Sequence, residues 1–108
     1  MIDFEKMEEK ALANFNGGEG VFYAKIEDDG HNKILKGRLE SGSSIGLHRH
    51  ETSSEVIFIL SGVGTMLLEG EEEILTPGVC HYCKKGCAHT LKNNGQEDLI
   101  FYAVVPQQ

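Results

Sequence analysis

Two histidines and a glutamate lie close together in the stretch from Gly42 to Gly62. One residue separates His48 from His50, and side chains on a β-strand alternate between its faces, so both imidazoles should project to the same side. Glu55 follows a short polar link that can turn the chain back, and the apolar run after it predicts a second strand. Two imidazoles and a carboxylate together suit a borderline divalent metal ion. The competing interpretation is a strand that carries solvated polar side chains.

The residues that follow Gly20 predict an all-β domain over 20–108. Short runs rich in β-branched and aromatic residues alternate with clusters of Gly, Asp, Asn and Ser. The expected strands cover 21–26, 34–39, 45–50, 55–60, 65–68, 72–76, 79–83, 89–92 and 99–105. Antiparallel chains of this kind avoid exposed edges by closing into a barrel or a two-sheet jelly roll. Such a closed structure can leave room for one small ligand at its mouth.

Residues 1–19 are expected to form a short helix or an extended arm. Asp3 is placed to cap a helix that runs to about Phe15, and the apolar residues between them fall near helical spacing. Gly17 and Gly18 would end that helix, because glycine tolerates the left-handed conformation at a C-cap. The charged start of the chain has no apolar secretory segment, which predicts a cytoplasmic protein.

Length, charge, hydropathy and cysteine count limit what kind of protein this is. The chain has 108 residues, which predicts one domain. Its 17 acidic and 10 basic residues give a formal net charge of −7, which argues against binding to the phosphates of nucleic acid. No apolar run approaches the roughly 18 residues of a membrane span. The 3 cysteines all lie late in the chain, and their odd number argues against a disulfide framework and for reduced thiols.

Two spaced motifs resemble those of the cupins, and the resemblance covers about residues 20–105. The first cupin motif is matched at every fixed position, by Gly42, His48, His50, Glu55 and Gly62. The second is resembled by Gly78, Lys84, Gly86, His89 and Asn93, with lysine at position 84 where the family usually has proline. That proline shapes a turn and binds no metal, so the departure leaves the site intact.

The resemblance implies a small single-domain cupin, a double-stranded β-helix or jelly-roll barrel, with a metal held by His48, His50, Glu55 and His89. The residues alone indicate the first three ligands. His89 enters through the family, and on its own it could be a core histidine that bonds a backbone carbonyl.

The expected ligand set carries little charge. Three neutral imidazoles and one carboxylate would leave a divalent ion with a net charge near +1, which a partly dry barrel tolerates. Manganese, iron, cobalt, nickel, copper and zinc all accept these nitrogen and oxygen donors. A six-coordinate ion would keep about two positions for water, dioxygen or a bidentate substrate.

Strand alternation adds residues that could line a substrate pocket. Ile57 and Ile59 share the face of Glu55, and Leu91 shares the face of His89. Tyr82 could line the pocket or pack outside it, and Cys87, two residues before His89, could approach the site.

Arg38 and the cysteines each leave two interpretations open. Arg38 is the one cation on a central strand that could hold an anionic substrate, and its alternative is a surface salt bridge. Cys80, Cys83 and Cys87 could form a second metal site or a redox pair with His81 nearby. Cys80 and Cys83 should point to opposite faces of a regular strand, which favours simple structural roles.

The resemblance implies a metal that acts as a Lewis acid or redox centre on a small polar molecule. Oxygenase, isomerase and decarboxylase activities all occur on this scaffold, so the fold does not choose among them. If the protein is an enzyme, a metal-dependent dioxygenase and an isomerase are two possibilities. The alternative is a non-catalytic cupin that binds or senses a sugar or a small acid. A structural dimer module without metal is the third hypothesis. A homodimer is expected by analogy with the family and from the exposed edge of a short β-domain.

Overall fold

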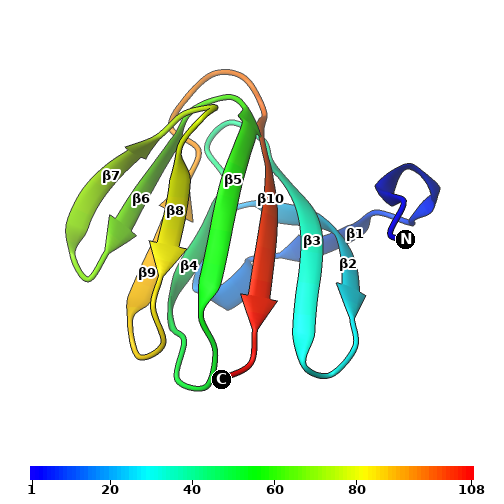
Figure 1. Ribbon diagram of the computed structural model, residues 1–108. Helices are drawn as coiled ribbons and strands as arrows, with labels where there is room; N and C mark the ends of the chain where they lie inside the picture. Colours follow the sequence, from blue (N-terminus) through cyan, green and yellow to red (C-terminus); the bar gives the residue numbers. More distant parts are fainter.

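Two antiparallel sheets pack against each other in the computed structural model, which describes residues 1–108 (Figure 1). The larger sheet has six strands in the order β1-β2-β3-β10-β5-β8, and the smaller has four in the order β4-β9-β6-β7. The strands are β1 (Lys10–Ala13), β2 (Val21–Asp28), β3 (Asn32–Leu39), β4 (Ser44–Arg49), β5 (Glu55–Ser61), β6 (Gly64–Leu68), β7 (Glu71–Leu75), β8 (Cys80–Cys83), β9 (Ala88–Lys92) and β10 (Leu99–Pro106). This architecture confirms the expected all-β jelly roll.

The strands expected from Val21 onward are all present, with ends that differ by one or two residues. The hairpin between β6 and β7 shows why turn residues in the sequence were sufficient to predict where strands end. Its two turn residues, Glu69 and Gly70, have φ angles of 48° and 80°. A two-residue turn with positive φ at both positions matches the twist of the strands that it joins.

The predicted helix between Asp3 and Phe15 is wrong. Residues Phe4–Lys6 and Phe15–Gly17 form only the short 3-10 turns η1 and η2, and Asp3 caps the first of them by accepting a hydrogen bond from the backbone N–H of Glu5. Between the turns, β1 pairs with β2 as an edge strand, because pairing with the sheet satisfies its backbone and outweighs a weak helical pattern. None of the helical segments has the length or apolar character of a membrane span.

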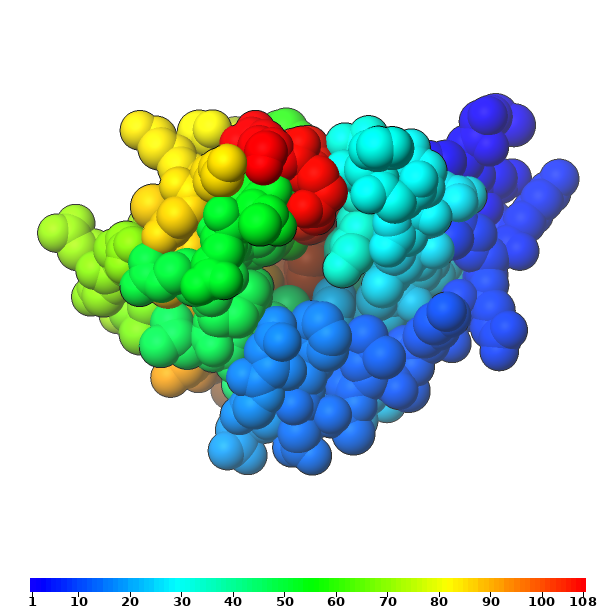
Figure 2. Space-filling view, turned by 90° about the horizontal axis from the view of Figure 1, so that it is seen from below, coloured from blue at the N-terminus to red at the C-terminus, as the bar shows by residue number.

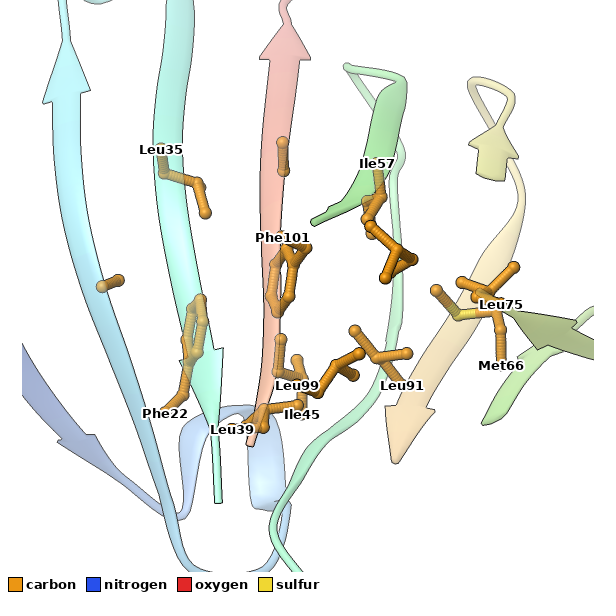
Figure 3. Close-up of a cluster of buried hydrophobic side chains, with 13 residues drawn as sticks. Phe22, Leu35, Leu39, Ile45, Ile57, Met66, Leu75, Leu91, Leu99 and Phe101 are labelled. Atoms are coloured by element: carbon orange, nitrogen blue, oxygen red, sulfur yellow. The ribbon is translucent and has the colours of Figure 1, made fainter. Parts of the chain in front are cut away.

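The hydrophobic core lies between the two sheets (Figure 3). Phe101 and Leu99 on β10 and Leu39 on β3 contribute from the larger sheet, and Met66 and Leu91 from the smaller, each at most 2% exposed. Inward-facing residues alternate with outward-facing ones along β10, whose burial follows period two from Leu99 to Val105. The core therefore fixes which face of every strand points inward, and with it the direction of the polar side chains further along the same strands.

Candidate metal centre

Three strands bring the four predicted ligand residues together. His48 lies on β4 and His50 directly after it, Glu55 begins β5, and His89 lies on β9. The pairing of β4 with β9 sets His48 opposite His89. One potential ligand atom from each of the four residues lies within 4.8 Å of all the others, so the cluster is positioned to hold a metal ion.

The spacing of the donor atoms fits an ion without rearrangement. The Nε2 atom of His89 lies 3.0 Å from Nε2 of His50 and 3.1 Å from Nε2 of His48. Oε1 of Glu55 lies 3.1 Å from Nε2 of His50 and 3.0 Å from Nε2 of His89. Adjacent ligands at right angles around an ion, each bonded at about 2.1 Å, are separated by ~3.0 Å. These four pairs of donor atoms therefore have the spacing of neighbouring ligands around one metal ion.

Each ligand histidine has a hydrogen-bond partner at its other ring nitrogen. Nδ1 of His48 lies 2.8 Å from the carbonyl oxygen of Gly46, and Nδ1 of His50 lies 2.8 Å from Oγ of Ser53. Nδ1 of His89 lies 2.9 Å from Nε2 of His81. Partners of this kind fix the tautomer and the ring orientation of a metal-binding histidine. All three imidazoles can therefore present a bare Nε2 to the same point.

Burial and local charge set the ionisation of the cluster. Burial is the largest influence on Glu55 and opposes its ionisation, but hydrogen bonds with His50 and His89, and their charges, lower its pKa to about 2. Burial also lowers the pKa of His48 below its ordinary value, and the carbonyl of Gly46 only partly offsets this. The cluster thus favours an anionic carboxylate beside a neutral imidazole at His48, which are the protonation states that a metal requires.

His81 is a member of this region that sequence reasoning did not place in the site. Its side chain is fully buried on β8, and its Nδ1 lies 2.6 Å from Oε1 of Glu73 on β7. Burial lowers the pKa of His81, although the hydrogen bond with Glu73 raises it in part. Alternation along β8 puts His81 and Cys83 on the inward face, and this was the available signal. The pairing of β8 with β5, which sets His81 beside Ile57, is non-local and has no signature in the sequence.

A cavity of about 220 Å³ opens beside the ligand cluster. Viewed from below, the molecule is hollowed between the N-terminal segment, the β2–β3 region, the loop after β4 and the C-terminal end (Figure 2). The cavity is lined by three of the ligand residues and by mostly apolar side chains, namely Phe15, Asn16, Phe22, Ile26, Lys33, Leu35, Ile45, His48, His50, Glu55, Phe101 and Val105. Lys33 is the one cation of this lining. It forms no ion pair within the chain, and it was not predicted.

A close backbone contact holds one wall of the cavity. A Cβ atom at Gly46 would lie 2.0 Å from the carbonyl oxygen of Asn16, and a Cβ atom at Gly18 would lie 2.2 Å from the carbonyl oxygen of Ser44. Only glycine allows this approach. The η2 turn, in which Asn16 has a φ of 53°, is thereby held against β4 and closes the space in front of His48.

None of the six predicted pocket residues lines this cavity. Ile57, Ile59 and Leu91 do face inward, as their parity indicated, but they belong to the hydrophobic core. Arg38 lies away from this cavity and forms ion pairs of 2.9 Å to Glu9, 3.5 Å to Asp98 and 3.7 Å to Glu40. Of the two interpretations of Arg38, the structure therefore supports the surface salt bridge. The guanidinium of Arg38 also stacks on the ring of Tyr23 at 4.1 Å.

Tyr82 and the cysteines lie outside the cavity as well. Tyr82 is 49% exposed on the outer face of β8. Cys80 is exposed and Cys83 is buried, as the alternation predicted, and all three cysteines are free. Burial raises the pKa of Cys83 to about 12, which leaves an unreactive thiol. Cys87 contacts the site through its backbone, whose carbonyl accepts a hydrogen bond from the N–H of His50.

Comparison with known proteins connects this geometry to a family. The chain is 32% identical over 100 residues to an oxalate-binding protein of Thermotoga maritima, an alignment that covers 87% of this chain and 83% of the relative. A crystal structure of a predicted oxalate decarboxylase from Thermotoga maritima superposes with a TM-score of 0.93 at 25% identity, over 100% of this chain and 99% of the other.

A second solved structure is similar over the whole chain. It is a putative sugar phosphate isomerase from Acidithiobacillus ferrooxidans, with a TM-score of 0.80 and 26% identity over 100% of this chain and 74% of the other. The family model described as Cupin domain matches residues 35–105, which include all four predicted ligands. On this match, and on the jelly roll with its three histidines and one glutamate, the chain belongs to the cupin family.

Proposed function

We propose that this chain binds one divalent transition metal through His48, His50, Glu55 and His89, and through the metal a small acid with two oxygen donors, such as oxalate. The observation that carries the proposal is the convergence of three Nε2 atoms and one carboxylate oxygen beside a cavity. A bound metal supplies Lewis acidity at that point. The similarity to an oxalate-binding protein supports the choice of ligand.

Charge at the site supports a dianion. The ligand set contributes one carboxylate and three neutral imidazoles, so a divalent ion there leaves a net charge near +1. Lys33 adds a second positive charge in the cavity lining. The chain as a whole carries a formal charge of −7, so this cavity would be its local positive centre. A small dicarboxylate neutralises both charges, and apolar walls such as Phe22 and Phe101 offer no hydrogen-bond partners to further polar groups of a larger ligand.

The lining favours binding over turnover. Apart from the ligand residues, Lys33 is the one ionisable side chain in the cavity, so no second carboxylic acid is available there to donate or accept a proton. A catalytic alternative, metal-dependent decarboxylation or isomerisation, is favoured by the opening of the cavity onto His48, His50 and Glu55, because purely structural metal sites are closed.

Metal analysis and calorimetry test the proposal. We expect the untagged protein to bind one equivalent of a divalent metal, and oxalate to bind with a measurable heat only when the metal is present. His50→Ala should weaken metal binding by at least about 100-fold, because it removes a ligand and leaves the others unable to close around the ion. The matched control is His31→Ala, which changes a histidine in an exposed turn.

Three outcomes separate the hypotheses. An unchanged metal affinity in His50→Ala would contradict the ligand set. Tight metal binding without any oxalate binding would contradict the proposed ligand. Release of formate and carbon dioxide from oxalate would establish the catalytic alternative, and acetate, which has a single carboxylate, serves as the control acid in both assays.

A homodimer is proposed on the outer face of the larger sheet. Phe58 on β5, Tyr82 on β8 and Tyr102 on β10 are 48%, 49% and 39% exposed, and the register places Tyr102 beside Phe58. Exposed aromatic residues on neighbouring strands are typical of interfaces. Light scattering should give twice the mass of 11.9 kDa, and a Phe58→Lys variant should give the monomer mass. A monomeric wild-type protein would contradict this assignment.

A further inference from the structure

We propose that Glu73 and His81 are positioning residues for the metal centre: they form a hydrogen-bonded chain that holds His89 as the Nδ1–H tautomer and links this one ligand to a carboxylate near the surface. The inference rests on the proposed metal site. It adds two residues outside the ligand set, on strands β7 and β8, and assigns a direction to both hydrogen bonds.

The direction of the chain follows from the metal-binding atom. If Nε2 of His89 faces the ion, the N–H of its neutral ring must be on Nδ1, which lies 2.9 Å from Nε2 of His81. That nitrogen of His81 must then be bare and accept the hydrogen bond. The remaining N–H of His81 is on Nδ1, which lies 2.6 Å from Oε1 of Glu73, and a carboxylate can only accept. Every donor in the chain thus has an acceptor.

The packing holds this arrangement rigidly. The rings of His81 and His89 stack with centroids 5.2 Å apart and planes inclined by 22°. The side chain of His81 is 0% exposed, whereas that of Glu73 is 40% exposed. His81 belongs to the larger sheet and the other two residues to the smaller, so the chain also joins the sheets. The partly exposed carboxylate of Glu73 is therefore linked to the buried ligand His89 through the fully buried ring of His81.

The three ligand histidines differ in this respect. His48 has a backbone carbonyl and His50 a serine hydroxyl as the partner of Nδ1, and both partners are neutral. His89 is the ligand whose Nδ1 hydrogen bond leads to a carboxylate, that of Glu73, through His81. A hydrogen bond from a ligand imidazole toward a carboxylate raises the basicity of the ligand, and loss of such partners weakens metal binding by about 10- to 100-fold.

The hydrogen bonds from His89 through His81 to Glu73 also oppose a competing position for the proton of His89. Oε1 of Glu55 lies 3.0 Å from Nε2 of His89 and would stabilise a proton there, on the atom that the metal needs. An acceptor at Nε2 of His81 favours the proton on the other nitrogen of His89. Without His81, the proton of His89 would be on Nε2 and would have to leave this atom before a metal could bind there. The affinity for the metal should therefore fall even though all four ligands remain.

Zinc affinity, measured by competition with a chelator, tests the inference on the full chain. His81→Leu removes the acceptor and fills its buried place with an apolar side chain, and should weaken zinc binding about 10- to 100-fold. Glu73→Gln keeps an acceptor but removes the charge, and should weaken it about tenfold, at the lower end of the same range. His81→Gln places an amide oxygen near the position of Nε2 and should restore part of the affinity. The matched control is Glu72→Gln, an exposed neighbour on the same strand that should bind zinc like the wild type.

Nitrogen-15 NMR of the zinc-loaded wild type supplies a readout that a purely structural role would not give. We expect His81 and His89 each to carry a proton on Nδ1 only. A proton on Nε2 of His81 would overturn the inference, as would zinc affinities of Glu73→Gln and His81→Leu equal to that of the wild type, and in both cases the proposed metal site would stand. A wild-type chain that binds neither zinc nor any other divalent transition metal would overturn both proposals. If His81→Leu does not fold, the half-exposed Glu73→Gln and the NMR assignment still decide the matter.

Discussion

The space between the two sheets has an apolar end and a histidine end, and both are built on the same strands. On the inward face of β5, Glu55 is followed by Ile57 and Ile59, and on β9, His89 is followed by Leu91. The isoleucines and Leu91 are at most 5% exposed and belong to the core. Glu55 is the first residue of β5 and His89 the second of β9, and the two meet beside the cavity.

This contrast shows how the fold divides stability from function. Burial of the apolar end is favourable by itself, at about 25 cal/mol for each Å² of apolar surface. The histidine end gathers three imidazoles and a carboxylate in a small volume, where burial disfavours the charged form of His48. Burial also opposes the charge of Glu55, and hydrogen bonds with His50 and His89 are needed to keep that carboxylate ionised. A cation there stabilises the polar end, so the apolar end must keep the site assembled before the metal arrives.

The largest effect is expected at the apolar end. Leu39 is 0% exposed, and Leu39→Ala should lower the free energy of unfolding by about 2–5 kcal/mol, because the deletion leaves a cavity in a closed part of the core. Zinc affinity of the fraction that remains folded should be unchanged. Chemical denaturation of the metal-free protein measures the first quantity and chelator competition the second. Leu47→Ala, at a 69% exposed position, is the control and should shift stability by less than about 0.5 kcal/mol. A parallel loss of metal affinity in Leu39→Ala would show that the two ends are not separable.

The histidine end should give the metal-free protein a marked acid sensitivity. The pKa of His48 and of His81 is lowered from the ordinary value of 6.5, so below that pH the unfolded chain binds more protons than the folded one and the free energy of unfolding falls. Glu55 acts in the same direction at lower pH, because its pKa falls from 4.5 to about 2.

Each unit of pKa difference is worth about 1.4 kcal/mol, so the contribution of Glu55 is of the order of 3 kcal/mol, present above pH 4.5 and lost progressively toward pH 2. Urea denaturation at several pH values measures the profile, with Glu55→Gln as the variant that should flatten its acidic part. A metal-free stability that stays constant from pH 7 to about pH 4 would contradict the buried state of these groups.

The sequence predicted the parts of this comparison that depend on local pattern. Strand parity placed His48 and His50 on the same side of a strand and Glu55 on the face of Ile57 and Ile59. His89 was identified by its place in the second motif. Parity also placed Ile57, Ile59 and Leu91 inward, but it could not tell where along a strand the cavity ends and the core begins. That boundary depends on which residues of the opposite sheet fill the space, which is a property of tertiary packing.

The other residues of this region that the sequence did not predict also depend on tertiary packing. Lys33 lies at the start of β3 and Asn16 in the η2 turn, and they meet at the cavity only because β1 pairs with β2 and Gly46 admits the turn. His81 was visible as a histidine on a short strand, but its contact with His89 crosses from one sheet to the other. Contacts between sheets leave no periodic signal along the chain.

The smallest effect is expected at Arg38, which the sequence left between two roles. Its ion pair with Glu9 joins side chains that are 27% and 36% exposed, so Arg38→Gln should cost less than about 1 kcal/mol of stability. Zinc and oxalate affinity should both be unchanged, because Arg38 is not part of the cavity lining. The matched variant is Lys33→Gln, which removes the same charge from the cavity and should weaken oxalate binding several-fold while it leaves zinc binding intact. Calorimetry with oxalate compares the two variants directly. Weaker oxalate binding in Arg38→Gln than in Lys33→Gln would move the anion site to the outer face of the larger sheet and reverse the assignment of the two cations.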